Sequence, residues 1–215
     1  NEALTHAAAH FSVNLDIDWI DAKTFEKHPE TIEILNKYKG IIVPGGFGES
    51  GVEGKMMAIK FAREHNIAYL GLCYGLQLAI VEFARNVCNM ENAHTTEVMP
   101  DTKFPVIDIM ESQKEIKQKG GTMRLGSYAC VLKTDTKVFN LYQKLGRIEK
   151  DRLNLDTLNS ERLGNINDGF IITEKHRHRY EVNPKFIKDL ENKGLIFSGY
   201  HERNDNTKLM EFIEL

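Results

Sequence analysis

The sequence predicts an α/β fold, an open and mostly parallel twisted sheet with helices on both faces and antiparallel additions. Two observations lead to this prediction. Between residues 39 and 87, short apolar runs alternate with segments whose apolar residues recur at helical spacing. After residue 100, short strand-like pieces are joined by polar stretches instead. The first half should therefore form parallel β–α units, and the second half antiparallel strands.

The expected elements follow one another in a simple order. In the first half they are a helix over 1–10, a strand over 12–21, a helix over 29–38, a strand ending near 43, a helix over 52–66, a strand over 67–72 and a helix over 74–87. In the second half they are strands over 104–110, 124–133, 177–183 and 194–200. The charged and weakly periodic stretch 146–173 is expected to be a surface insertion.

Composition excludes several classes of protein. The 215 residues are 41% hydrophobic, which is enough for one core, and the net charge of −3 favours neither nucleic acid nor a membrane surface. No apolar run approaches the roughly 20 residues of a membrane helix. Three widely spaced cysteines, without a CxxC motif or a zinc-type Cys/His cluster, indicate reduced thiols in the cytoplasm and no metal site.

A glycine-rich loop follows the strand that ends near residue 43. Gly46, Gly48 and Gly51 match the spacing of a dinucleotide-binding loop, but the next strand ends in Leu72-Cys73-Tyr74 without the acidic residue that such a site needs. Two other interpretations remain. The glycines serve a turn with positive φ, or they let the backbone approach a substrate oxygen and donate N–H groups to it. We favour the second.

Cys73 stands between Gly71 and Gly75, where an apolar strand passes directly into a helix. This arrangement is typical of a nucleophile elbow, with sulfur as the nucleophile. The helix N-terminus should favour the thiolate, and the N–H of Tyr74 together with one from the loop at Gly45 and Gly46 should stabilise an oxyanion. The alternative is a small buried hydrophobe, which is how we interpret Cys88 and Cys130. The elbow predicts acyl chemistry on an amide or ester.

Five motifs together carry a family resemblance. "PGGFG", "GLCYGLQLAIVEFARNV", "MENAHTTE", "KGGTMRLG" and "KHRHRYEVNP" occur in this order. They resemble the class I glutamine amidotransferase domain of the CTP synthase family, which implies a flavodoxin-like core and one such domain over residues 1–215. The resemblance implies that L-glutamine is hydrolysed through a thioester on Cys73, with Gly46 and Tyr74 as oxyanion donors. The ammonia would pass to a separate synthase domain.

In this family the synthase domain aminates UTP to CTP with ATP and Mg, so the resemblance implies no cofactor in the present domain. It also implies GTP as an activator and a homotetrameric parent enzyme. The implied substrate-binding residues are Gly45, Gly46, Phe47, Tyr74, Gly75, Gln77, Glu97, Arg179 and Tyr180. Among them, Glu97 would bind the α-ammonium group of glutamine, and the segment at Arg179 would bind its α-carboxylate. Otherwise Glu97 is a surface charge, and the "HRHR" run is a solvated basic face.

The same resemblance implies a mobile lid associated with GTP activation. Its residues are Gly121, Thr122, Met123, Arg124 and Leu125. The alternative is a flexible glycine hairpin.

The sequence departs from the family pattern at two points. Tyr74 stands where the family has an aliphatic residue. The family's general base is a His-x-Glu pair on a late strand, and none of the eight histidines matches it. His28-Pro29-Glu30 lies before the glycine loop, where a helix should begin. The resemblance therefore places a first strand, the His-x-Glu strand and the synthase domain outside residues 1–215. The alternative function is a catalytically impaired regulatory or assembly module of the same fold.

Overall fold

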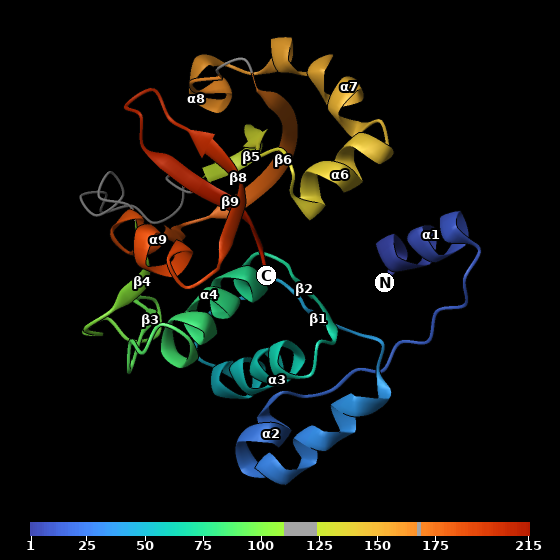
Figure 1. The fold of residues 1–215 in the computed structure, drawn as a ribbon, viewed down its shortest axis with the longest axis vertical. Helices are drawn as coiled ribbons and strands as arrows, with labels where there is room; N and C mark the ends of the chain where they lie inside the picture. Colours follow the sequence, from blue (N-terminus) through green and yellow to red (C-terminus); the bar gives the residue numbers. More distant parts are fainter. Residues whose placement is uncertain (110–123, 167–168) are drawn as a thin grey trace.

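The computed structural model describes residues 1–109, 124–166 and 169–215. Figure 1 shows two regions: β1, β2, α3 and α4 in the lower half, and an antiparallel sheet with α6, α7 and α8 in the upper half. The α/β class predicted from the sequence is confirmed by this arrangement and by the antiparallel strands of the second half. The two regions share one core, because buried residues of α3 and α4 pack with Val182, Leu190 and Phe197.

The strands form three sheets. β1 (Gly40–Val43) pairs in parallel with β2 (Ala68–Gly71). β3 (His94–Thr95) is parallel to β4 (Pro105–Ile109), which is antiparallel to β7 (Tyr180–Val182). The third sheet is antiparallel and has the order β6 (Phe170–His178), β5 (Arg124–Leu132), β8 (Ile196–Glu202) and β9 (Lys208–Glu214). Among the described residues, parallel pairing is thus confined to two short pairs.

The central helix α4 (Tyr74–Asn86) positions the elbow. Ten of its residues are buried, and Leu78, Ile80 and Val81 are completely enclosed. Its neighbour α3 (Val52–Glu64) buries the apolar face that the sequence predicts, with Met56, Ile59 and Phe61 inside and Lys60 exposed. The first residue of α4 is therefore held by a rigid core.

The predicted strand over 12–21 is wrong. After α1 (Glu2–Phe11), which buries no residue, this segment is extended but unpaired, and the Trp19 side chain is 75% exposed. No strand among the described residues lies beside it, so its peptide groups have no ladder partner and remain in water. Figure 1 shows α1 set apart from the rest of the molecule. Alternating apolar residues alone were not sufficient to form a strand.

The remaining helices connect these sheets. α2 (Lys23–Lys27) precedes η1 (Pro29–Lys37), a 3-10 helix where the sequence predicts a helix over 29–38. The stretch 146–173 contains α7 (Arg147–Arg152), η2 (Leu155–Thr157), α8 (Ser160–Leu163) and the start of β6, and it buries Ile148, Asp151 and Ile172. α6 (Lys137–Lys144) and α9 (Pro184–Glu191) complete the fold.

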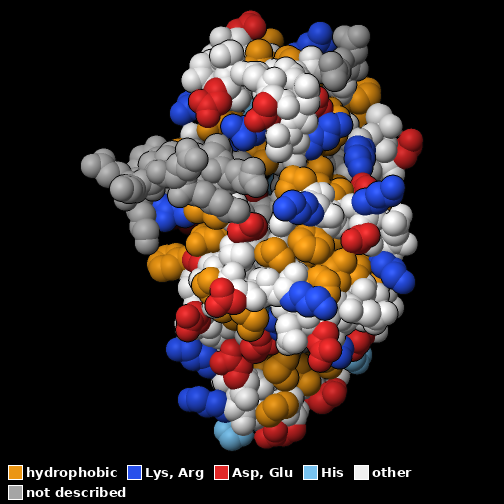
Figure 2. Space-filling model, turned by 90° about the vertical axis from the view of Figure 1, so that its left-hand side faces the viewer, with side chains coloured by type: hydrophobic (Ala, Val, Ile, Leu, Met, Phe, Trp, Pro, Cys, Tyr) orange, Lys and Arg blue, Asp and Glu red, His pale blue; other side chains and the backbone are white. Residues whose placement is uncertain are grey.

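The surface mixes both signs of charge. On the face shown in Figure 2, acidic and basic side chains are interspersed around hydrophobic groups, without a field of one sign. None of the helices in the described part of the chain is long and apolar enough to cross a membrane.

Candidate active site

Cys73 occupies a sharp bend between β2 and α4. Its φ of 55° and ψ of −103° are unusual for a residue with a side chain, and such backbone strain clusters at functional sites. Neither flanking glycine can be replaced by a residue with a side chain, because other backbone atoms lie too close. A Cβ on Gly75 would lie 2.1 Å from the carbonyl oxygen of Val43, and one on Gly71 would lie 2.6 Å from the carbonyl carbon of Gly75. The local geometry is that of the elbow expected from the sequence.

The glycine loop runs beside the sulfur. A Cβ on Gly45 would lie 3.4 Å from Cβ and 3.9 Å from Sγ of Cys73. The backbone N–H groups of Tyr74 and Gly46 both bond the Cys73 thiol group and lower its pKa. The structure thus brings together the nucleophile and the two N–H donors that the sequence analysis named.

The net pKa shift of Cys73 is nevertheless upward. The side chain reaches solvent, but burial of the sulfur is the largest cause of the raised pKa, and the carboxylates of Glu181 and Glu97 add to it. The shift is opposite to the thiolate preference expected from the helix N-terminus. Two N–H donors do not compensate for desolvation combined with two nearby carboxylates, so a base or a bound substrate has to assist ionisation.

Two hydrogen bonds join predicted substrate-binding residues to one another or to the glycine loop. Glu97 accepts a hydrogen bond from the N–H of Gly48 at 3.0 Å, and Gln77 Nε2 donates to the carbonyl oxygen of Tyr180 at 2.9 Å. Glu97 is therefore a part of the site and not an isolated surface charge. Phe47 is 85% exposed and does not line an enclosed pocket in this structure. Arg179 precedes Tyr180 at the edge of β7.

The lid residues divide between two places. Gly121, Thr122 and Met123 lie outside the described residues, whereas Arg124 and Leu125 begin β5. Arg124 is only 5% exposed and forms ion pairs with Glu211 and, at 3.6 Å, with Glu181. Its assignment to a mobile lid is therefore corrected, because two carboxylates hold its guanidinium group inside the protein.

These three residues belong to a buried ionic cluster that the sequence analysis missed. His176 Nε2 lies 2.5 Å from Glu211 Oε2, and His178 Nδ1 lies 3.9 Å from Glu181. The signal available in the sequence was a glutamate within an apolar strand, in "RYEVN" and in "LMEFIEL". Because Glu181 lies between Tyr180 and Val182 on β7, the cluster connects the antiparallel sheet to the strand that meets Gln77.

The guanidinium group of Arg124 pairs with two carboxylates in this cluster, and the pKa values of these two groups shift in opposite directions. Glu211 is bonded by Arg124 and His176, and its pKa is lowered although burial opposes this. Burial raises the pKa of Glu181 to about 7, with a further contribution from Glu211. Burial lowers the pKa of His178 to about 4, so this ring is neutral at pH 7. Glu181 therefore holds a proton up to near neutral pH.

Comparisons with known proteins agree with this geometry. A family model described as glutamine amidotransferase class-I matches residues 1–215. The chain belongs to the class-I glutamine amidotransferase family. It is 44% identical over 220 residues to the CTP synthase of Methanocaldococcus jannaschii and 45% identical over 214 residues to that of Sulfurisphaera tokodaii, with 100% of this chain and 35% of each relative covered. The chain thus spans about a third of the length of these relatives.

A solved structure is also similar. The glutaminase domain of Trypanosoma brucei CTPS with bound acivicin aligns with a TM-score of 0.81 and 29% identity, covering 99% of this chain and 72% of that chain. The class I amidotransferase fold expected from the sequence motifs is confirmed by this likeness.

In the described part of this amidotransferase domain, the hydrogen bonds and ion pairs of the histidines join them to groups other than the nucleophile. Within the described residues, no hydrogen bond joins a histidine to Cys73. His28 Nδ1 is 3.6 Å from Glu30 at an exposed position, and Pro29 begins η1, as a first-turn proline should. His201 is buried and bonds the carbonyl of Ala129. The described residues also contain no cluster of three or more His, Cys, Asp or Glu side chains suited to a metal ion.

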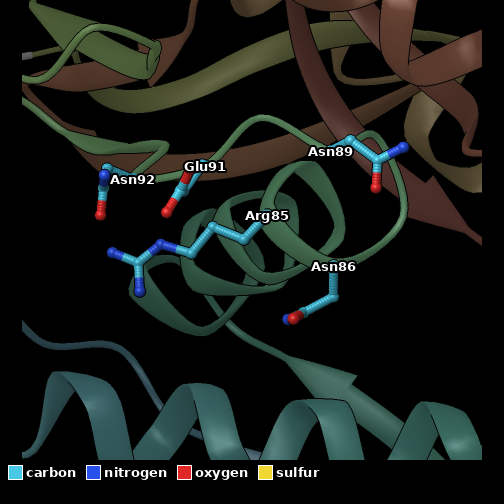
Figure 3. A pocket seen from close by; sticks show the side chains of 5 residues that line it. All are labelled: Arg85, Asn86, Asn89, Glu91 and Asn92. Atoms are coloured by element: carbon cyan, nitrogen blue, oxygen red, sulfur yellow. The ribbon is translucent and has the colours of Figure 1, made fainter.

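A polar pocket at the far end of α4 is separate from this site. Figure 3 shows the residues that line it: Arg85, Asn86, Asn89, Glu91 and Asn92. The guanidinium group of Arg85 is already hydrogen-bonded, because its Nη1 donates to Glu53 and its Nε donates to the carbonyl oxygen of Ala93. The pocket therefore has no free guanidinium group, and it lies a whole helix away from Cys73.

Replacing Glu181 by glutamine should change how stability depends on pH. The folded-state pKa of about 7 lies above the ordinary glutamate value of 4.5, so the folded protein binds an extra proton between these pH values and loses stability as pH rises through them. His178 has the opposite effect on the pH dependence of stability: its pKa is lowered in the folded protein, so its contribution to stability increases as pH rises. In urea titrations from pH 4.5 to 7.5, we expect Glu181→Gln to gain stability over the wild type, by on the order of 3 kcal/mol. A pH-independent difference would contradict this assignment.

Proposed function

We propose that this chain hydrolyses L-glutamine as the glutaminase domain of a CTP synthase. The observation that carries the proposal is Cys73, strained at an elbow with the N–H groups of Gly46 and Tyr74 directed at its sulfur. This arrangement suits attack on a carboxamide carbon, because the oxygen that becomes negative meets two donors that are already in place. Membership of the class-I family supports glutamine as the amide.

The chemistry has two halves. The sulfur of Cys73 attacks the side-chain carbonyl carbon, the electron pair moves to the oxygen, and ammonia leaves with one added proton as the thioester forms. Water then hydrolyses the thioester to glutamate and restores the thiol. Glu97 is proposed to bind the α-ammonium group, because its carboxylate lies next to the glycine loop. The N–H groups near Arg179 and Tyr180 are proposed to bind the α-carboxylate.

At the level of the whole protein, the proposal is a C–N bond-forming ligase of pyrimidine biosynthesis. The ammonia would pass to a synthase domain that aminates UTP to CTP, and ATP and Mg would bind there and not in this domain. GTP activation, a homotetramer and a cytoplasmic location are part of the same proposal. The CTP synthase relatives, of which this chain covers 35%, support the ligase part of the proposal, and the sequence motifs shared with that family support the rest.

A second candidate function is a regulatory or assembly module that keeps the fold without turnover. It is favoured by the raised pKa of Cys73 and by the lack of a described histidine bonded to it. Release of ammonia from L-glutamine by the protein that carries this chain distinguishes the two candidates. Measurable release supports the glutaminase, whereas no release despite labelling of Cys73 supports the module.

Trapping the nucleophile tests the site directly. We expect a chloroketone analogue of glutamine to alkylate Cys73, because the sulfur reaches solvent beside the glycine loop. Peptide mapping by mass spectrometry should show one modified cysteine, and L-glutamine should slow the reaction. Cys73→Ser should abolish labelling, whereas Cys88→Ser should leave it unchanged. Labelling confined to Cys88 or Cys130 would rule out the proposed site.

A further inference from the structure

The residue that follows the nucleophile has an unexpected role for its side chain. Tyr74 is 1% exposed, and its ring extends beneath the glycine loop. A Cβ on Gly46 would lie 3.5 Å from Cδ1 of this ring, and the hydroxyl group donates a hydrogen bond of 2.7 Å to the carbonyl oxygen of Gly48. The ring is therefore buried against the glycine loop, and its hydroxyl group is bonded to the backbone of that loop.

The peptide groups on either side of Gly48 are held by two side chains. Tyr74 bonds its carbonyl oxygen, and Glu97 accepts its N–H at 3.0 Å. Gly48 itself has a φ of +75° and no atom within 4 Å of the position of a Cβ, so packing does not restrain it. Among the described residues, the only other bond from the peptide groups of residues 44–48 to another segment is that of Gly46 to Cys73.

Burial keeps the phenol suited to this task. It raises the pKa of Tyr74, with further contributions from Glu97 and Glu49, so the hydroxyl group remains protonated and donates. Lys55 Nζ lies 5.6 Å from the ring centroid, within the range of a cation–π interaction that stabilises the ring.

We propose that Tyr74 is a positioning residue whose hydroxyl group holds the glycine loop so that the N–H of Gly46 points at the oxyanion. One residue then supplies one oxyanion donor through its own backbone and fixes the other through its side chain. This matters because donors contribute most when they are in place before charge develops. The inference rests on the proposed function, since it assigns the loop to oxyanion stabilisation.

The variant Tyr74→Phe removes only the hydroxyl group. The matched control is Tyr142→Phe, which removes a phenol bonded to Glu174 in the separate core cluster beside α6. Alkylation of Cys73 is measured with two probes. In the chloroketone analogue of glutamine, sulfur adds to the carbonyl carbon, and the carbonyl oxygen becomes negative. The sulfur then bonds the neighbouring methylene carbon as chloride leaves and the carbonyl group re-forms. Iodoacetamide instead loses iodide in a direct displacement that needs no oxyanion donor.

We expect Tyr74→Phe to lower the limiting rate of chloroketone labelling about five- to tenfold, the value of one net hydrogen bond. The concentration for half-saturation and the iodoacetamide rate should stay at the wild-type values, and Tyr142→Phe should change none of the three. Amide hydrogen exchange should rise in residues 45–48 of Tyr74→Phe only.

Three results would overturn the inference. The first is an unchanged rate of chloroketone labelling in Tyr74→Phe. The second is an equal loss of rate with iodoacetamide, which would assign the effect to the thiol itself. The third is loss of the fold, because the inference limits the effect of the hydroxyl group to the loop. A wild-type protein that the chloroketone does not label at Cys73 would count against the proposed function instead. In that case, the exchange of residues 45–48 still decides whether Tyr74 holds the loop.

Discussion

Gly75→Ala should destabilise the protein by about 3 kcal/mol or more, because the added methyl group has no space. Its Cβ would lie 2.1 Å from the carbonyl oxygen of Val43 and 3.0 Å from the carbonyl carbon, which are backbone atoms of β1. α4 would have to move away from the sheet and carry Cys73 with it. Urea unfolding, followed by circular dichroism, measures the loss of stability.

Gly40→Ala is the matched control for this substitution. Its added Cβ would meet the carbonyl oxygen of Ala68 at 3.5 Å, an ordinary contact. We expect its unfolding midpoint to stay close to that of the wild type. Should Gly75→Ala behave like Gly40→Ala, the close approach of α4 to β1 would be incorrect, and with it the geometry of the elbow.

Arg124→Met should cost about 3–5 kcal/mol at pH 7, because it leaves two buried carboxylates without their guanidinium partner. Glu181 and Glu211 are both almost completely enclosed, and Arg124 lowers the pKa of each. The folded-state pKa of both carboxyls should rise in the variant, so its stability should fall more steeply than that of the wild type as pH rises above 4.5. Urea unfolding at several pH values measures both effects.

The control for Arg124→Met is Lys133→Met. Lys133 pairs with Glu191 at 3.2 Å, but both side chains are more than 40% exposed. A solvated pair of this kind contributes at most about 1 kcal/mol. Equal losses in the two variants, or a loss for Arg124→Met that does not depend on pH, would show that Glu181 and Glu211 do not depend on Arg124.

The parts of the site that were predictable from the sequence are local. The elbow depends on five consecutive residues. Gly71 and Gly75 stand at the two positions where another part of the backbone leaves no space for a side chain, so the sequence itself marks these close contacts. α3 and α4 were likewise predictable, because helical spacing of apolar residues lies within one segment. The strand over 12–21 failed for a complementary reason. A strand needs a neighbour, and the alternation of side chains in one segment carries no information on whether a neighbour is present.

The sequence by itself predicted the nucleophile, its two N–H donors and the family, since each prediction rests on short runs of neighbouring residues. Only the tertiary structure decided the partners of distant groups, as with Gln77 and Tyr180, 103 residues apart, or Arg124 and Glu211, 87 residues apart. It also showed that Arg124, predicted as a lid residue, is a buried charge, and that the hydroxyl group of Tyr74 bonds the glycine loop. The physical reason is that burial and pairing are properties of what surrounds a side chain, and folding brings those surroundings from elsewhere in the chain.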